Sequence, residues 1–138
     1  MSTDFVIDNS VVMAWCFDDE SNEFTDSIQD RLLNSTAFVP AIWPLEVINV
    51  LLDAERKKRL NKNDGRRFIA LISALPIVVE SAPPFQTFHD TLPLARKHRL
   101  SSYDASYLEL AIHKNIPIAT LDEAIIRAAK SIKLPIVG

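Results

Sequence analysis

Residues 5–10 of this chain are Phe5-Val6-Ile7-Asp8-Asn9-Ser10, an apolar run that ends abruptly in an acid. A short apolar run bounded by polar residues is typical of a buried strand. Similar runs recur at Ala37-Phe38-Val39, Ile77-Val78-Val79, Ile118-Ala119 and Pro135-Ile136-Val137. Segments with helical spacing lie between them, for example Phe24, Ile28 and Leu32. Strands that alternate with helices predict an α/β fold built on a parallel sheet.

The composition predicts one folded domain over residues 1–138. A chain of 138 residues with 48% hydrophobic and 24% charged residues is ordinary for a soluble globular protein. No internal repeat or long linker divides it. No apolar stretch approaches the roughly 18 uninterrupted residues of a membrane span. The start of the chain also lacks the basic leader of a secretory signal. We therefore expect a cytoplasmic protein that does not associate with membranes.

Charge and residue usage exclude several functional classes. The formal net charge of −3 argues against a protein that coats nucleic acid by charge alone. Gly65 and Gly138 are the only glycines, so no glycine-rich dinucleotide-binding or phosphate-binding loop can form. His89, His98 and His113 lack the spacing of a helical metal pair. A histidine-based hydrolase or a zinc site is therefore not expected.

Proline and glycine positions predict where the helices begin and end. Pro40 and Pro44 bracket the entry to a helix that runs through Glu46 to about Arg59. Residues 61–65 are expected to form a turn. Pro93 falls inside an otherwise helical stretch, which it should kink or end.

Asp8 directly follows the first predicted strand. Open parallel sheets bind their ligands at the carboxyl ends of the strands, which favours a functional role for this acid. The alternative is that Asp8 caps the next helix, which we expect to begin near Val11. Asn9 or Ser10 could provide that cap instead.

Three further acids occupy positions where the apolar pattern predicts a residue that faces the protein interior. Asp104 and Asp122 each begin an apolar helical stripe, although an acid in a first helical turn is often only a favourable partner of the helix dipole. Glu46 is surrounded by apolar neighbours, and Asn49 lies three residues on, as a polar companion on the same helix face.

A shared divalent cation would satisfy these acids together. A carboxylate that faces the interior must be paired, protonated or bound to a metal. No Lys or Arg lies within one turn on the local stripe of Glu46 or Asp104. Oxygen ligands without clustered Cys or His favour Mg²⁺ or Mn²⁺. Such a site could hold metal-activated water for in-line attack on a phosphodiester.

The chain also resembles a known family, the PIN-domain ribonucleases, and specifically toxins of the VapC type from type II toxin–antitoxin (VapBC) modules. The resemblance rests on the order and spacing of four segments: Ile7-Asp8-Asn9-Ser10, Pro44-Leu45-Glu46-Val47-Ile48-Asn49-Val50-Leu51, Tyr103-Asp104-Ala105-Ser106-Tyr107-Leu108-Glu109-Leu110-Ala111 and Ala119-Thr120-Leu121-Asp122. It implies a PIN-like fold with a central parallel sheet of four to five strands flanked by helices. It also implies a Mg²⁺- or Mn²⁺-dependent endoribonuclease, a homodimer and a small VapB-type antitoxin partner.

The resemblance assigns roles to individual residues. The catalytic, metal-binding quartet is Asp8, Glu46, Asp104 and Asp122, and the supporting polar residues are Ser10 and Thr120. Asn9 departs from the small residue that is more usual after the first acid, and Pro93 falls where the family tends to have an uninterrupted helix. Neither departure touches the quartet.

Several features allow two interpretations. The basic runs Arg56-Lys57-Lys58-Arg59 and Arg96-Lys97-His98-Arg99, with Lys62, Arg66 and Arg67, either hold the RNA backbone or only stabilise helix ends. Core packing is favoured over base stacking for Trp43 and Phe38. Cys16 is expected to be a buried structural thiol. The alternative to the nuclease itself is a catalytically silent PIN-like module that serves binding or scaffolding.

Overall fold

The computed structural model describes residues 3–138, and its centre is a parallel sheet of four strands in the order β3-β2-β1-β4. The strands are β1 (Phe5–Ile7), β2 (Ala37–Pro40), β3 (Ile77–Glu80) and β4 (Ile118–Ala119). Val6 of β1 pairs with Phe38 on one side and with Ile118 on the other. The predicted α/β class and parallel sheet are confirmed.

The strand order places a topological switch point beside β1. The chain passes from β1 outward to β2 and β3, and then returns to add β4 on the opposite side of β1. Connections on the two sides of β1 therefore diverge, and open parallel sheets bind their ligands at such a point, beyond the carboxyl ends of the strands. Asp8 follows β1 at this point, and Thr120 follows β4.

The fifth predicted strand forms only a single bridge. Ile136 pairs in parallel with Ile118, with hydrogen bonds from Ile118 N to Pro135 O (3.1 Å) and from Val137 N to Ile118 O (2.9 Å). Pro135 has no N–H to extend the ladder, and Lys133 just before it has a positive φ of 58°. The run is therefore apolar and paired, yet too short for a strand.

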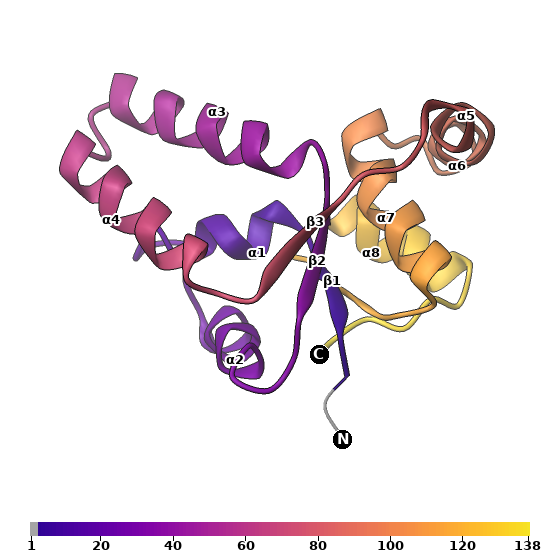
Figure 1. Cartoon of the computed structure of the whole chain (residues 1–138), viewed down its shortest axis with the longest axis horizontal. Coiled ribbons are helices and arrows are strands. Elements are labelled where there is room, and N and C mark those ends of the chain that lie inside the picture. The colour runs from indigo at the N-terminus through magenta and orange to yellow at the C-terminus, as the bar shows by residue number, and fades with distance from the viewer. Residues whose placement is uncertain (1–2) are drawn as a thin grey trace.

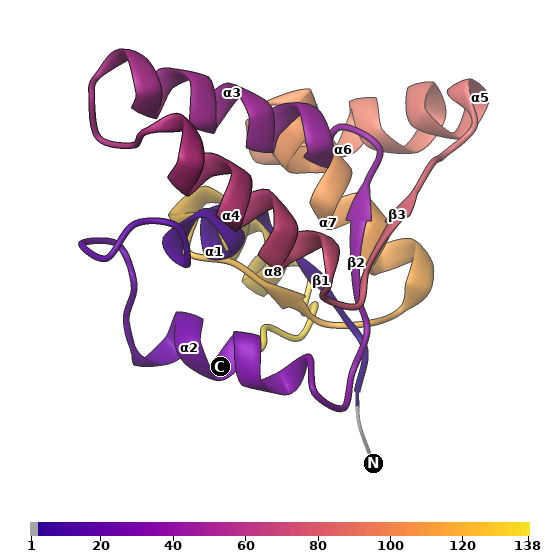
Figure 2. The same ribbon diagram turned by 60° about the vertical axis from the view of Figure 1, so that its left-hand side comes forward.

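Helices cover both faces of the sheet (Figure 1). One face carries α1 (Asn9–Ala14), α2 (Glu23–Arg31), α3 (Trp43–Arg56) and α4 (Lys62–Ser73). The other carries α5 (Pro84–Gln86), the π-helical turn η1 (Thr87–Thr91), α6 (Leu92–His98), α7 (Ser102–Lys114) and α8 (Glu123–Ser131). Figure 2 shows α3 and α4 side by side as a hairpin that projects away from the sheet.

Three predicted helix boundaries were wrong. The first helix begins at Asn9 rather than near Val11, with Asp8 at its N-cap position. Helix α3 ends at Arg56 rather than near Arg59, because Lys58 takes a positive φ of 58°. Residues 61–65 are not a turn: the Asn61 side chain accepts a hydrogen bond from Asp64 N at 2.9 Å and thereby caps α4. Asn and Asp residues, as in this segment, are common both in turns and at helix N-caps, so the sequence pattern does not distinguish the two.

Pro93 does not end the helical stretch, which was one of the two predicted effects; the turn before it is wider instead. The π-helical turn η1 precedes α6, and Pro93 lies in the first turn of α6. Proline removes one backbone donor, and its ring clashes with the carbonyl four residues earlier. A π turn relieves that clash without ending the helix.

The core lies on both faces of β1, and each of the strand's residues is fully buried. Trp43 is buried, as expected for a core residue. Cys16 is only half-buried, which corrects the expectation of a buried thiol; burial, and then the charges of Glu20 and Asp64, raise its pKa to about 11. Among the described residues, no helix is long and apolar enough to cross a membrane.

Candidate active site

Asp8 is buried at the end of β1 and receives hydrogen bonds from two hydroxyl groups. Ser10 Oγ donates to Asp8 Oδ2 at 2.6 Å, and Thr120 Oγ1 donates to the same oxygen at 2.9 Å. Burial raises the pKa of Asp8, these hydrogen bonds oppose the shift, and the charge of Asp122 adds to it. The backbone of Ser10 also forms a hydrogen bond that lowers this pKa. No side chain of residues 3–138 donates to the second oxygen, Oδ1, which is therefore the more open of the two to another partner.

The same two hydroxyls hold the segment that follows β4. Thr120 Oγ1 accepts from Asp122 N at 2.9 Å, and Ser10 Oγ accepts from Leu121 N at 3.0 Å. Each hydroxyl thus donates to Asp8 and accepts from the backbone of residues 121–122. This arrangement fixes the position of Asp122 relative to Asp8, across a separation of more than 100 residues in sequence.

Glu46 lies in the first turn of α3 and is tied to α7. Tyr107 is fully buried, and its hydroxyl donates to Glu46 Oε1 at 2.6 Å. Burial raises the pKa of Glu46, the hydrogen bond from Tyr107 lowers it, and the charge of Asp8 raises it. Glu46 therefore lies close enough to Asp8 for their charges to interact.

Asp104 lies in the first turn of α7, whose N-cap is Ser101. Its backbone N–H donates to Ser101 Oγ at 3.1 Å, so the cap uses the amide of Asp104 and leaves the carboxylate available. Burial first, and then the charges of Asp122, Asp8 and Glu46, raise the pKa of Asp104 to about 6. Asp104 therefore lies close enough to each of the other three acids for their charges to interact with its own.

Asp122 is a helix cap as well as a member of the cluster. Its Oδ1 accepts from Ala124 N at 2.9 Å and from Ile125 N at 3.1 Å, at the start of α8. The capping alternative is therefore correct for this residue. The cap occupies Oδ1 and leaves Oδ2 for another partner. Asp122 can therefore cap α8 through Oδ1 and still bind a cation through Oδ2.

The four acids have the donor chemistry that Mg²⁺ or Mn²⁺ requires. They come from four separate segments, they offer only oxygen, and no Lys or Arg of the described chain forms a salt bridge with any of them. The side chains of residues 3–138 nevertheless contain no group of three acids, histidines or cysteines already spaced around one ion. The charges of these carboxylates disfavour one another, and a bound cation would offset that repulsion.

Comparison with known proteins gives the family. A sequence model described as "PIN domain" matches residues 5–131. The chain belongs to the PIN-domain family. No curated protein sequence matches it.

Two solved structures show the same fold. This PIN domain is similar to PAE2754 from Pyrobaculum aerophilum, with 20% identity, a TM-score of 0.68, and coverage of 93% of this chain and 81% of the other. It is also similar to FitAcB from Neisseria gonorrhoeae, with 16% identity, a TM-score of 0.64, and coverage of 97% and 96%. PIN domains are generally nucleases that use divalent metal ions, which agrees with the acidic cluster described above.

Asn49 is exposed on α3, one helical turn after Glu46, and its side chain forms no hydrogen bond within residues 3–138, so its supporting role stays a prediction. Two residues that sequence reasoning did not assign do belong near the site of this PIN domain. Tyr107 holds Glu46, and the buried Asn9 beside Asp8 has an Oδ1 without a hydrogen-bond partner in the described chain. In the sequence, Tyr107 fits the apolar stripe of its helix and carries no separate signal of this role.

Proposed function

We propose that this PIN domain is a magnesium- or manganese-dependent endoribonuclease and the toxin of a type II toxin–antitoxin module. The observation that carries the proposal is that the charges of Asp122, Asp8 and Glu46 all raise the pKa of Asp104, while none of the four acids has a salt-bridge partner in residues 3–138. A bound cation would stabilise the charged form of all four carboxylates, which otherwise favour protonation.

The roles of the residues follow from their contacts. Asp8, Glu46, Asp104 and Asp122 would hold the cation. Ser10 and Thr120 orient Asp8, and Tyr107 orients Glu46. When bound, Mg²⁺ or Mn²⁺ neutralises charge on a phosphodiester and activates water for hydrolysis. Asn49, exposed one helical turn after Glu46, remains a proposed supporting residue.

RNA cleavage by the purified protein tests the enzymatic part of the proposal. Total RNA is incubated with native protein and Mg²⁺, with native protein and EDTA, and with the Asp8→Asn variant and Mg²⁺. We expect cleavage only in the first reaction, and sequencing of the new RNA ends would identify the cut site. Cleavage that survives both EDTA and the substitution would refute the assignment of the site.

Growth arrest tests the toxin assignment, which also predicts a homodimer and a VapB-type antitoxin. Expression of the native protein in bacteria should stop growth, because an endonuclease that cuts RNA needed for translation stops protein synthesis. The Asp8→Asn variant should permit growth and still bind the antitoxin. Equal arrest by both proteins would show that toxicity has another source.

A catalytically silent PIN module is the second candidate. The observation in its favour is that the acids of residues 3–138 are not already spaced around one ion. A silent module would bind its partners in EDTA as well as in Mg²⁺, and would leave RNA intact in both. The cleavage reactions above therefore distinguish the two candidates.

A further inference from the structure

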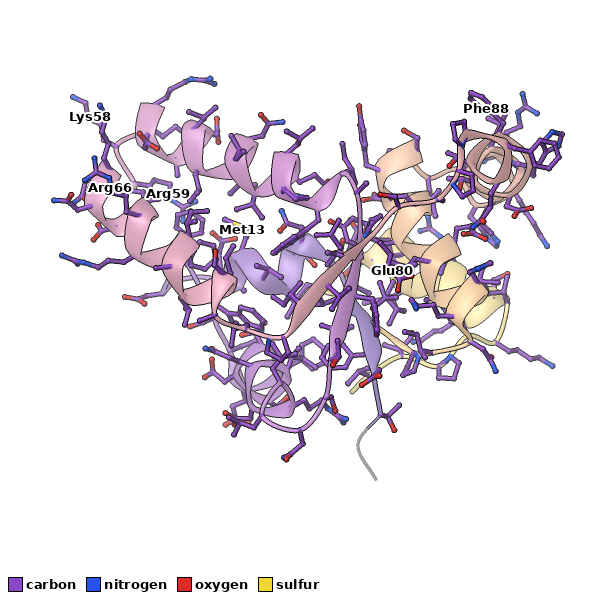
Figure 3. The ribbon with its side chains drawn as sticks, viewed as in Figure 1. Met13, Lys58, Arg59, Arg66, Glu80 and Phe88 are labelled. Carbon is purple, nitrogen blue, oxygen red and sulfur yellow. The ribbon has the colours of Figure 1, made fainter. Side chains whose placement is uncertain are left out.

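Basic residues gather at one end of a molecule that is acidic overall. Seven of the 15 Lys and Arg residues fall within residues 56–67, although the whole chain has a net charge of −3. This segment is the end of α3, the connection and the beginning of α4. Figure 3 shows Lys58, Arg59 and Arg66 together at the outer end of the α3–α4 hairpin.

Intramolecular ion pairs account for only part of this charge. Three pairings occur: Lys57 with Asp53, Arg67 with Asp64, and Arg59 with Asp19 and Glu20. The other four basic residues are exposed and have no salt-bridge partner in residues 3–138; we call them the basic tip: Arg56, Lys58, Lys62 and Arg66.

Helix dipoles do not explain the basic tip. Arg56 lies in the last turn of α3, where a cation is favoured. Lys62, however, is the first residue of α4, where the same dipole disfavours a positive charge by about 0.3–1 kcal/mol. Stabilisation of the helix therefore does not account for a basic residue at this position.

Arg59 anchors the backbone next to the basic tip. Its side chain donates to both oxygens of Asp19, at 3.0 and 3.1 Å, and to Glu20 at 3.2 Å. Its guanidinium also lies 4.4 Å from the centroid of the Phe17 ring. Arg59 thereby joins the α3–α4 connection to the α1–α2 connection and offsets the acids nearest the tip. An anchored backbone leaves mainly side-chain freedom to be lost when the tip binds a charged ligand.

One helix connects the basic tip to the acidic cluster. Glu46 lies in the first turn of α3 and Arg56 in its last turn, ten residues on, which corresponds to about 15 Å along the axis. The surface on the other side of the tip is acidic, because α2 and the segment before it expose Asp18, Glu23, Asp26 and Asp30. A polyanion held by the tip is therefore repelled on that side and favoured along α3 toward the cluster, where a bound cation would offset the acids.

We propose that the basic tip binds the phosphate backbone of the RNA substrate and positions the strand along α3, with its cleaved bond at the acidic cluster. This inference rests on the proposed ribonuclease activity and adds the surface that holds the substrate. Backbone binding carries no sequence information, so the tip supplies affinity and register.

RNA binding without cleavage tests the tip directly. The four tip residues are replaced together by Gln, and the Kd for a fluorescently labelled single-stranded RNA is measured in EDTA at several salt concentrations. Each lost phosphate contact should lower the slope of log Kd against log salt by about 0.7, or about 3 in all, and weaken binding about 10- to 100-fold. A matched control replaces four exposed basic residues that lie outside both basic runs: Arg31, Arg127, Lys130 and Lys133.

The outcomes separate this inference from the proposed activity. Weakened binding in the tip variant alone, with a raised KM and an unchanged kcat for RNA cleavage, supports the tip as the substrate-holding surface. Equal weakening in both variants would attribute the effect to net charge and overturn the proposal. Native cleavage of RNA with unchanged binding by the tip variant would also overturn it, while the nuclease assignment stands. If the tip variant binds RNA normally and loses antitoxin binding, the tip is a protein-binding surface. A native protein that neither binds nor cuts RNA would refute both proposals.

Discussion

The hydroxyl of Tyr107 donates to Glu46 Oε1 at 2.6 Å and joins α7 to α3 across 61 residues of sequence. Tyr107 is fully buried, and Glu46 is half-buried. Burial and the Glu46 carboxylate raise the pKa of Tyr107, so its hydroxyl stays protonated and donates. A short hydrogen bond to a carboxylate is stronger than a neutral one.

Tyr107→Phe should destabilise the protein by about 1–2 kcal/mol in denaturant unfolding, since it removes one partner of this hydrogen bond and keeps the ring. The pKa of Glu46 should also rise, because the bond that lowers it is lost. The variant should therefore need a higher pH to bind Mg²⁺. Tyr103→Phe is the control, because Tyr103 is 55% exposed. Indistinguishable behaviour of the two variants would argue against a positioning role for Tyr107.

Thr120→Val should cost about 1–2 kcal/mol of stability and weaken Mg²⁺ binding. The substitution keeps the shape of the side chain but removes a buried hydroxyl that donates to Asp8 and accepts from Asp122 N. Thr120→Ser retains the hydroxyl and should restore metal binding. Isothermal titration calorimetry measures the affinity for Mg²⁺. If the Thr120→Ser variant binds Mg²⁺ as weakly as Thr120→Val, then Thr120 contributes by packing only.

Asp8→Asn and Asp104→Asn should each abolish RNA cleavage and leave the metal-free protein as stable as the native one, or more so. Each substitution removes a charge that burial and neighbouring acids disfavour. Cleavage and thermal unfolding are measured on the same preparations. A variant that loses activity because it unfolds would give no support to the site.

Asp104 should make stability depend on pH in an unusual direction. Its pKa rises from 3.8 to about 6 on folding, so the folded protein binds more protons than the unfolded chain between these values. The contribution of Asp104 is fully present below about pH 4 and is lost as the pH rises through 6. The stability gain of Asp104→Asn over native protein should therefore grow over this window. A gain that is constant from pH 4 to 7 would contradict the raised pKa.

Added Mg²⁺ should raise the melting temperature of the native protein, because a ligand that binds only the folded state stabilises it by mass action. The increase should decline as the pH falls below about 6, where Asp104 takes up a proton. It should disappear in the Asp8→Asn, Asp104→Asn double variant. Differential scanning fluorimetry suffices, and a shift retained in that variant would place the metal elsewhere.

The sequence by itself determined the α/β class, the parallel sheet and the positions of the four acids at strand and helix ends. Apolar periodicity reports which face of an element is buried, and a short apolar run marks a buried strand. The run 5–7 followed by Asp8 therefore predicted both β1 and an acid at its carboxyl end, and the structure agrees. The same signal could not say whether residues 135–137 form a strand or a single bridge, since that depends on Pro135 and the turn before it.

Only the tertiary structure showed that Tyr107 serves Glu46. Tyr107 fits the apolar stripe of α7 in the sequence, and only the fold brings its hydroxyl to the Glu46 carboxylate in α3. Asn49 has the spacing of a companion to Glu46, and only the structure shows that its side chain is exposed on α3. Hydrogen-bond partners distant in sequence leave no local pattern, because their meeting depends on how whole helices pack.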